Sequence, residues 1–235
     1  MFAIMKRDFR SYFNSPIAYV VIGLFMFILA LFFNDGLATG SSDFIGDFVG
    51  TMSFLLMFFV PILTMKSVAE EKKNGTEVLL LTSPARITEI VAGKFLAAFC
   101  VFLVMTAFSL IFPIILIITG KPDVPLILCS YLGFILYGAV FVSVGVFASS
   151  LTENQIVAAV IGFVSLFGLT AINFVASFFS GFLNKAFLWL SINDRYSDFG
   201  AGIIDITSII FMLSFTVLFN FFTVRVLERK RWSQG

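Results

Sequence analysis

The sequence contains no histidine and only two cysteines, Cys100 and Cys129. The absence of histidine excludes most metal sites, histidine-dependent nucleophilic catalysis and histidine proton relays. Both cysteines lie in long apolar segments, where a thiol is usually a small packing residue, so no disulfide framework is predicted. The sequence also lacks a phosphate-binding loop of the form GxxxxGKS or GxxxxGKT. We therefore expect no catalytic, metal or cofactor site in this chain.

Charge is also scarce, because only 12% of the 235 residues are charged, whereas 60% are apolar and 33 are phenylalanine. Six uncharged runs have at least 18 residues each, and a helix needs about 20 residues to cross a bilayer. The sequence therefore predicts an all-α integral membrane protein with six transmembrane helices in a single transmembrane domain, residues 1–235. The predicted spans are 17–33, 49–65, 90–119, 124–149, 155–180 and 203–226.

No aspartate, glutamate, lysine or arginine lies near the middle of any predicted span. Ion-driven transporters, pumps and voltage sensors place ionisable groups there, although each group costs at least about 2.5–3.5 kcal/mol. The sequence therefore excludes these classes, and an energy source must lie in another chain. An intramembrane enzyme is disfavoured because catalytic residue sets are missing. A passive channel is an alternative, but it leaves the long charged loop described below unexplained.

Lysine and arginine are distributed unevenly between the two sides of the membrane. If both termini are cytoplasmic, the cytoplasmic segments hold 12 of the 15 basic residues, and only Lys121, Lys185 and Arg195 lie outside. The positive-inside rule therefore predicts a multi-pass protein with both termini in the cytoplasm. Because the basic residues set this orientation and the net charge is only +1, nothing indicates nucleic-acid binding.

The first 15 residues, MFAIMKRDFRSYFNS, have the pattern of an amphipathic helix. Lys6, Arg7 and Arg10 lie on its polar side. A basic amphipathic helix before the first span is expected to lie in the membrane interface, in contact with the lipid bilayer. The predicted apolar face consists of Phe2, Met5, Phe9, Tyr12 and Phe13.

A charged segment between the second and third predicted spans, residues 66–94, reads KSVAEEKKNGTEVLLLTSPARITEIVAGK. Asn74 and Gly75 are expected to end a helix that extends the second span. A second short helix is predicted over residues 77–82, because the pair Ser83–Pro84 disfavours its continuation. Three consecutive leucines indicate that this helix lies on the membrane surface or in the cleft of a partner. A solvated connector is the alternative.

The order of residues in this segment is an acidic pair, a basic pair, Gly-Thr, Glu, a leucine run, Ser-Pro and then Glu-Ile-Val-Ala-Gly-Lys. This order resembles the loop between the second and third spans of type-2 ABC exporter permeases. In that family, the loop carries a coupling helix that docks on a separate ATP-binding subunit. The matching residues are Glu70, Glu71, Lys72, Lys73, Gly75, Thr76, Glu77, Leu80, Thr82, Ser83, Pro84, Glu89, Gly93 and Lys94.

The resemblance implies that ATP and Mg²⁺ bind to a separate dimer of ATP-binding subunits. It also implies a second permease copy or a paralogous permease, since six spans form half of a translocation unit. It identifies the N-terminal helix as an elbow helix and implies a bacterial cytoplasmic (inner) membrane. The residues expected to dock the ATP-binding subunit are Glu70, Glu71, Lys72, Lys73, Gly75, Thr76, Glu77, Leu80 and Thr82 and, from a second loop, Glu153 and Asn154.

This second predicted cytoplasmic loop, residues 149–158, resembles the corresponding loop of the same family. Its residues alone indicate a capping box, in which Thr152 and Gln155 start the next helix. In the preceding span, Gly145 and Ser149 form a pair of small residues four positions apart, which predicts close helix packing.

Three further sequence features predict local structure within or between the spans. Pro61 is expected to kink the second span near its cytoplasmic end. Asn173 is expected either to hydrogen bond between helices or to face a wet cavity. The segment 182–202, between the fifth and sixth spans, mixes aromatic residues with charges, which favours the membrane interface. It resembles the external re-entrant or interfacial helices of these permeases.

The C-terminal portion resembles a subgroup of these permeases that is linked to gliding motility and to copper-site maturation. This subgroup implies an alternative function: an ATPase-driven subunit that acts mechanically in an envelope or gliding-motility complex, with envelope accessory proteins, and transports no solute. The matching residues are Gly202, Ile203, Ile204, Asp205, Leu227, Glu228, Arg231 and Trp232.

Overall fold

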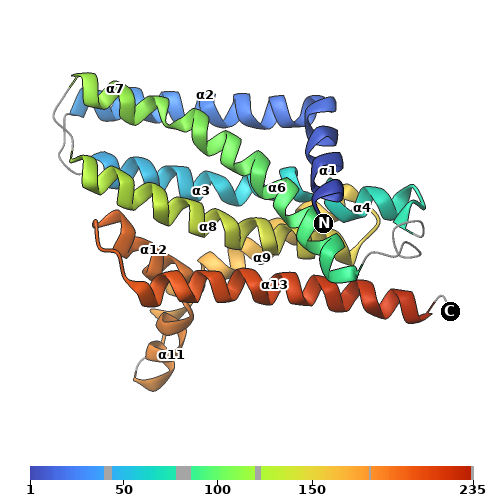
Figure 1. The fold of residues 1–235 in the computed structure, drawn as a ribbon. Helices are drawn as coiled ribbons and strands as arrows, with labels where there is room; N and C mark the ends of the chain where they lie inside the picture. The colour runs from blue at the N-terminus through green and yellow to red at the C-terminus, as the bar shows by residue number, and fades with distance from the viewer. Residues whose placement is uncertain (40–43, 78–85, 120–122, 180, 234–235) are drawn as a thin grey trace.

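The computed structural model describes residues 1–39, 44–77, 86–119, 123–179 and 181–233, and the regular structure in these ranges is α-helical. Most of the long helices run side by side in an elongated bundle (Figure 1). The helices are α1 Phe2–Asn14, α2 Pro16–Thr39, α3 Phe44–Thr64, α4 Lys66–Lys73, α6 Ile87–Ser109, α7 Ile111–Thr119, α8 Val124–Leu151, α9 Gln155–Thr170, α10 Ile172–Ala176, α11 Phe182–Leu190, α12 Ile192–Gly200 and α13 Ile206–Ser233.

Within the described residues, five helical segments are long and apolar enough to cross a membrane. One of them combines α3 with α4, and another combines α6 with α7. They correspond to the first four predicted spans and the last one, so the prediction of an all-helical membrane protein is confirmed. The segments are Pro16–Asn34, Gly46–Lys73, Ile87–Ile118, Val124–Leu151 and Ile206–Arg229.

The fifth predicted span, residues 155–180, is not one continuous helix. The 16 residues of α9 cover about 24 Å, which is less than the hydrocarbon thickness of about 30 Å. At the end of α9, the carbonyl oxygen of Thr170 accepts a hydrogen bond from Nδ2 of Asn193 in α12, at 3.1 Å. A side chain from a distant helix thus pairs with a carbonyl at the helix end. The five residues of α10 follow after this break.

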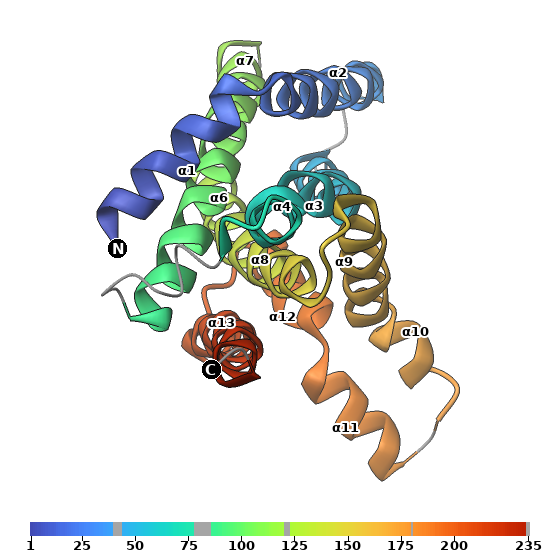
Figure 2. The same ribbon diagram turned by 90° about the vertical axis from the view of Figure 1, so that its right-hand side faces the viewer.

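The helix α8 lies at the centre of the bundle and contacts α3, α6, α9 and α13 (Figure 2). It is the most buried of the five candidate spans, whereas α2 and α13 are the least buried. A helix that is apolar on all sides belongs in a protein interior. The exposed apolar faces of α2 and α13 can instead contact lipid or another protein.

The close packing predicted for α8 is confirmed at its contact with α3. A Cβ atom added at Gly145 would lie 2.2 Å from Oγ1 of Thr64 in α3. One turn further along α8, Ser149 is completely buried against the junction of α3 and α4. The small residues therefore allow the two backbones to approach closely.

The helices α10, α11 and α12 fall in and around the segment predicted to be external, towards the end of the bundle opposite α1 and α4 (Figure 1). The helix α11 projects away from the bundle (Figures 1 and 2). Asn173 in α10 donates from Nδ2 to Oδ1 of Asp194 in α12, at 2.8 Å. Tyr137 in α8 donates to Oδ1 of Asn193, at 2.9 Å. These bonds hold α12 against α8 and α10, so Asn173 has the interhelical role, one of its two expected roles.

Candidate functional site

One end of the bundle brings together α1, α4, the start of α6 and the end of α8 (Figures 1 and 2). The helix α1 lies across this end instead of continuing the line of α2 (Figure 1). Between them, Ser15 is extended, with φ −100° and ψ 143°. A proline disfavours helical geometry in the residue before it, so the pair Ser15–Pro16 explains this change of direction.

The amphipathic helix predicted at the N-terminus is present as α1, and its apolar face packs largely on protein. Tyr12 is buried. Phe2, at the first position of the helix, is 74% exposed and lies outside this packing. The basic residues predicted to point away, Lys6, Arg7 and Arg10, are exposed. The remaining residues of the apolar face, all partly buried against the core, are Met5, Phe9 and Phe13.

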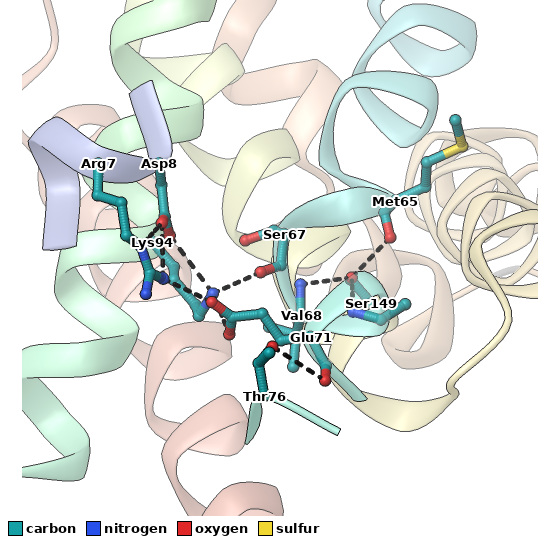
Figure 3. Close-up of polar contacts among 10 residues, drawn as sticks. Arg7, Asp8, Met65, Ser67, Val68, Glu71, Thr76, Lys94 and Ser149 are labelled. Atoms are coloured by element: carbon teal, nitrogen blue, oxygen red, sulfur yellow. Dashed lines mark hydrogen bonds and ion pairs between the residues drawn. The ribbon is translucent and has the colours of Figure 1, made fainter. Parts of the chain in front are cut away.

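Lys94, near the start of α6, is the centre of an ion-pair network (Figure 3). Its side chain is 2% exposed, and Nζ lies 2.6 Å from Glu71 of α4 and 3.4 Å from Asp8 of α1. Nζ also donates to the carbonyl oxygen of Ser67, at 2.6 Å. Arg7 of α1 pairs with Glu71 at 2.5 Å and with Asp8 at 2.8 Å. The network therefore connects α1, α4 and α6.

The network contains two positive and two negative groups, so its charges balance. A buried ammonium group is costly unless it is paired and hydrogen bonded, and the two carboxylates and the Ser67 carbonyl meet this need for Lys94. Burial disfavours the charged form of Arg7, but the carboxylates of Asp8 and Glu71 raise its pKa, so the guanidinium stays charged.

The hydroxyl group of Ser149 connects α8 to the break between α3 and α4 (Figure 3). It donates to the carbonyl oxygen of Met65 at 2.9 Å and accepts from the N–H groups of Val68 and Ala69 at 3.0 and 3.1 Å. N–H groups in the first turn of a helix generally have no partner within that helix. Pro61 was predicted to kink this span, and the helix is interrupted at Met65, one turn after the proline. The Ser149 hydroxyl stabilises this interruption.

Residues 2–234 of the chain match the family described as ABC-2 family transporter protein. The chain belongs to this family. No curated protein matches the chain. Family membership, together with the five apolar helices of spanning length, establishes a multi-pass membrane protein of the ABC-2 transport family, which is a transport component and not itself an enzyme.

In this ABC-2 family protein, the residues expected to dock an ATP-binding subunit differ in their exposure. Glu71 belongs to the ion-pair network, and Lys72 is buried. Glu70 and Glu77 are half-buried. Leu80 and Thr82, like most of the predicted coupling helix, lie outside the described residues. The exposed members of the set are Lys73, Gly75, Thr76, Glu153 and Asn154.

Lys72 brings the two predicted docking loops together. Its Nζ donates a hydrogen bond to the carbonyl oxygen of Ser150, near the end of α8. Two residues after Lys72 the backbone leaves α4, and Gly75 adopts a left-handed conformation with φ 70°, as predicted for the residue that ends this helix. The end of α4 and the α8–α9 turn, which contains Glu153, therefore lie at the same end of the bundle.

The capping box predicted for α9 is wrong. The N-cap is Asn154, whose Oδ1 accepts a hydrogen bond from the N–H of Ile156 at 2.9 Å. Oγ1 of Thr152 accepts from the N–H of Asn154 at 3.2 Å. An asparagine directly before a helix is as good a cap as threonine, and here it stands two residues closer to α9.

Sequence reasoning missed the roles of Arg7, Asp8, Lys94 and Ser149 in this site. A signal for Asp8 does exist, because it is the only acidic residue among the first 34 and stands beside Arg7 on the polar side of α1. For Ser149, the small-residue pattern indicated close packing but not the hydrogen bonds to α4. The partners of these residues come from helices far apart in the sequence, so no local pattern reveals them.

Proposed function

We propose that the chain is the membrane-spanning permease subunit of an ABC exporter, driven by a separate ATP-binding subunit that docks at the α4 end. The family match supports the transport role. The main support for the docking site is the hydrogen bond from Lys72 to the Ser150 carbonyl oxygen. This bond brings the two predicted cytoplasmic loops together, and both loops have exposed residues at this end of the bundle. The predicted coupling helix at 77–82 directly follows α4.

The contacts of α4 explain how docking at its end moves the spans. Ser149 connects α4 to α8, and the helix itself is joined to α3 at Met65. Glu71 connects it to Lys94 of α6 and to Arg7 of α1. A displacement of α4 by the ATP-binding subunit is therefore transmitted to three spans and to α1 at once. ATP and Mg²⁺ belong to the partner chain in this scheme.

The same proposal includes the membrane location and topology of the chain. It is a subunit of the bacterial cytoplasmic membrane with both termini in the cytoplasm, and α1 is an interfacial elbow helix. α9 and α10 together form the fifth of six spans, and α11 and α12 lie at the outer surface. The exposed apolar faces of α2 and α13 suit lipid and a second permease copy or a paralogue.

Charge reversal at the docking surface tests this function. We expect Lys73→Glu or Glu153→Lys to reduce, by about fivefold or more, the amount of ATP-binding subunit that co-purifies, because reversed charges at an interface repel the partner. The partner to test is a phosphate-loop ATPase, sought first in the neighbouring reading frame. Lys185→Glu, an exposed change on α11 at the other end of the bundle, is the control. Undiminished co-purification with both reversals contradicts the docking surface.

The C-terminal pattern around residues 202–205 and 227–232 favours a second candidate, the mechanical role of the gliding-motility subgroup. Both candidates require the same ATPase docking, so the experiment above does not separate them. Reconstituted vesicles do: a mechanical subunit supports ATP hydrolysis without movement of a solute, whereas an exporter couples the two.

A further inference from the structure

A polar cavity of about 350 Å³ lies between α1, α4 and the start of α6. This volume is within the range of small-molecule sites, about 300–1,000 Å³. Ile17, in the first turn of α2, forms part of the wall, so the cavity lies where the first span reaches the membrane boundary. The side chains that line it include three acids and three bases, which are Asp8, Glu70, Glu71, Arg7, Lys66 and Lys94.

Four of these charged groups belong to the ion-pair network, and the other two do not. Within the described part of the chain, Glu70 forms no ion pair, and the ammonium group of Lys66 is hydrogen bonded to Oγ of Ser15 at 3.2 Å. Lys66 and Glu70 are four residues apart, on the same face of α4. The cavity thus offers one cation and one anion that the network does not use.

Tyr12 supplies a third group. Its side chain is 7% exposed, and its hydroxyl group lies beside the Ser67 side chain but makes no hydrogen bond of regular geometry among the described residues. A buried hydroxyl without a partner is unfavourable, so this position favours a ligand atom or a bridging water. Burial and the nearby carboxylates of Asp8 and Glu70 raise the pKa of the phenol more than the contact with Ser67 lowers it, so the group stays protonated and can donate.

We propose that this cavity binds the headgroup of phosphatidylethanolamine. A phosphate oxygen accepts hydrogen bonds from the Tyr12 hydroxyl and the Lys66 ammonium group, and the lipid ammonium group pairs with Glu70. The equal number of acids and bases favours a zwitterion over an anionic headgroup. The depth of the cavity, between an amphipathic helix and the first turn of a span, is that of membrane headgroups. This site does not depend on the proposed ATPase docking.

The test measures binding of short-chain lipids to the full chain in detergent by isothermal titration calorimetry. The probes are dihexanoyl phosphatidylethanolamine, dihexanoyl phosphatidylglycerol and water-soluble O-phosphoethanolamine. We expect the ethanolamine lipid to bind about tenfold more tightly than the glycerol lipid, a difference equal to one charge-assisted contact. Glu70→Gln should remove this preference, and Tyr12→Phe should weaken both lipids. Lys73→Gln, on the exposed end of α4, should change neither affinity.

Equal affinities for the two lipids overturn the proposal, and so does a preference that survives Glu70→Gln in a folded variant. Equally tight binding of O-phosphoethanolamine also overturns it, because the ligand is then a soluble phosphorylated amine instead of a lipid. If Glu70→Gln does not fold, the comparison of the two lipids on the unchanged protein decides. Lys73→Glu and Glu153→Lys should reduce ATPase retention and leave lipid binding intact, which separates the two proposals.

Discussion

At the scale of single residues, Lys94 connects three helices through one buried charge. Its ammonium group is almost completely buried and reaches two carboxylates on two other helices. Pairs of this kind contribute little when compared with apolar substitutes, but removal of one partner is costly because the others stay buried and unpaired. Lys94 therefore fixes the relative position of α1, α4 and α6 more than it adds to overall stability.

We expect Lys94→Met to destabilise the protein by about 1–3 kcal/mol, since Asp8 and Glu71 then keep only the half-exposed Arg7 as a counter-charge. The measurement is chemical or thermal unfolding of the purified chain in detergent. Lys73→Met, at an exposed position two residues after Glu71, should change stability by no more than about 0.5 kcal/mol. Similar stabilities of the two variants would show that the network is not structural.

Ser149 makes the second prediction at this scale. Ser149→Ala leaves two N–H groups of α4 and the Met65 carbonyl without their partner, which should cost about 1–3 kcal/mol. Ser143→Ala is the matched control, because the Ser143 hydroxyl is equally buried and donates only within α8, to Val140 at 2.7 Å. Unfolding of both variants measures the difference. A cost at Ser143 as large as that at Ser149 would argue against the special role of the α4 contact.

At the scale of helices, α8 organises the bundle because its small residues permit contacts on several sides. We expect Gly145→Ala to destabilise the protein by about 1–3 kcal/mol, since the new methyl group collides with Thr64 in α3. Gly168→Ala in α9 meets no atom within 4 Å and should instead stabilise its helix by about 0.5–1 kcal/mol. Thermal unfolding of both variants checks the sign, and stabilisation by Gly145→Ala would refute the close contact.

The sequence predicts helices well where one local property decides them. Long uncharged runs predicted five apolar helices of spanning length that the structure contains, and the pair Asn74–Gly75 correctly marked the end of α4. The break after Thr170 could not be predicted, because it involves a hydrogen bond from Asn193, 23 residues away. The predicted docking set also included Glu71 and Lys72, although both side chains point into the protein. Their partners lie on α1, α6 and α8, far away in the sequence, so no local pattern predicts these contacts. Charge and spacing identify a loop, but partners distant in the sequence decide which side chains it presents.

At the scale of the whole molecule, the proposed function requires α4 and α11 to lie on opposite sides of the membrane. A variant in which alanine replaces Cys100 and Cys129 allows single cysteines to be introduced at Asn74 and Lys185, both exposed. In intact cells with a permeable outer envelope, we expect a membrane-impermeant maleimide to label Lys185→Cys and not Asn74→Cys. Asn74→Cys should react only after the membrane is opened. Labelling of Asn74→Cys from outside would reverse the topology and exclude cytoplasmic docking.

The ion-pair network also joins residues that the ribosome synthesises at different times. Arg7 precedes Glu71 by 64 residues, and Asp8 precedes Lys94 by 86 residues. At a synthesis rate of roughly 5–20 residues per second, the ribosome delivers Lys94 about 4–17 s after Asp8. During this interval, α1 lacks its ion pair with Lys94. The complete network can therefore form only after Lys94 has been synthesised, and until then Arg7 is the counter-charge available to Asp8 and Glu71.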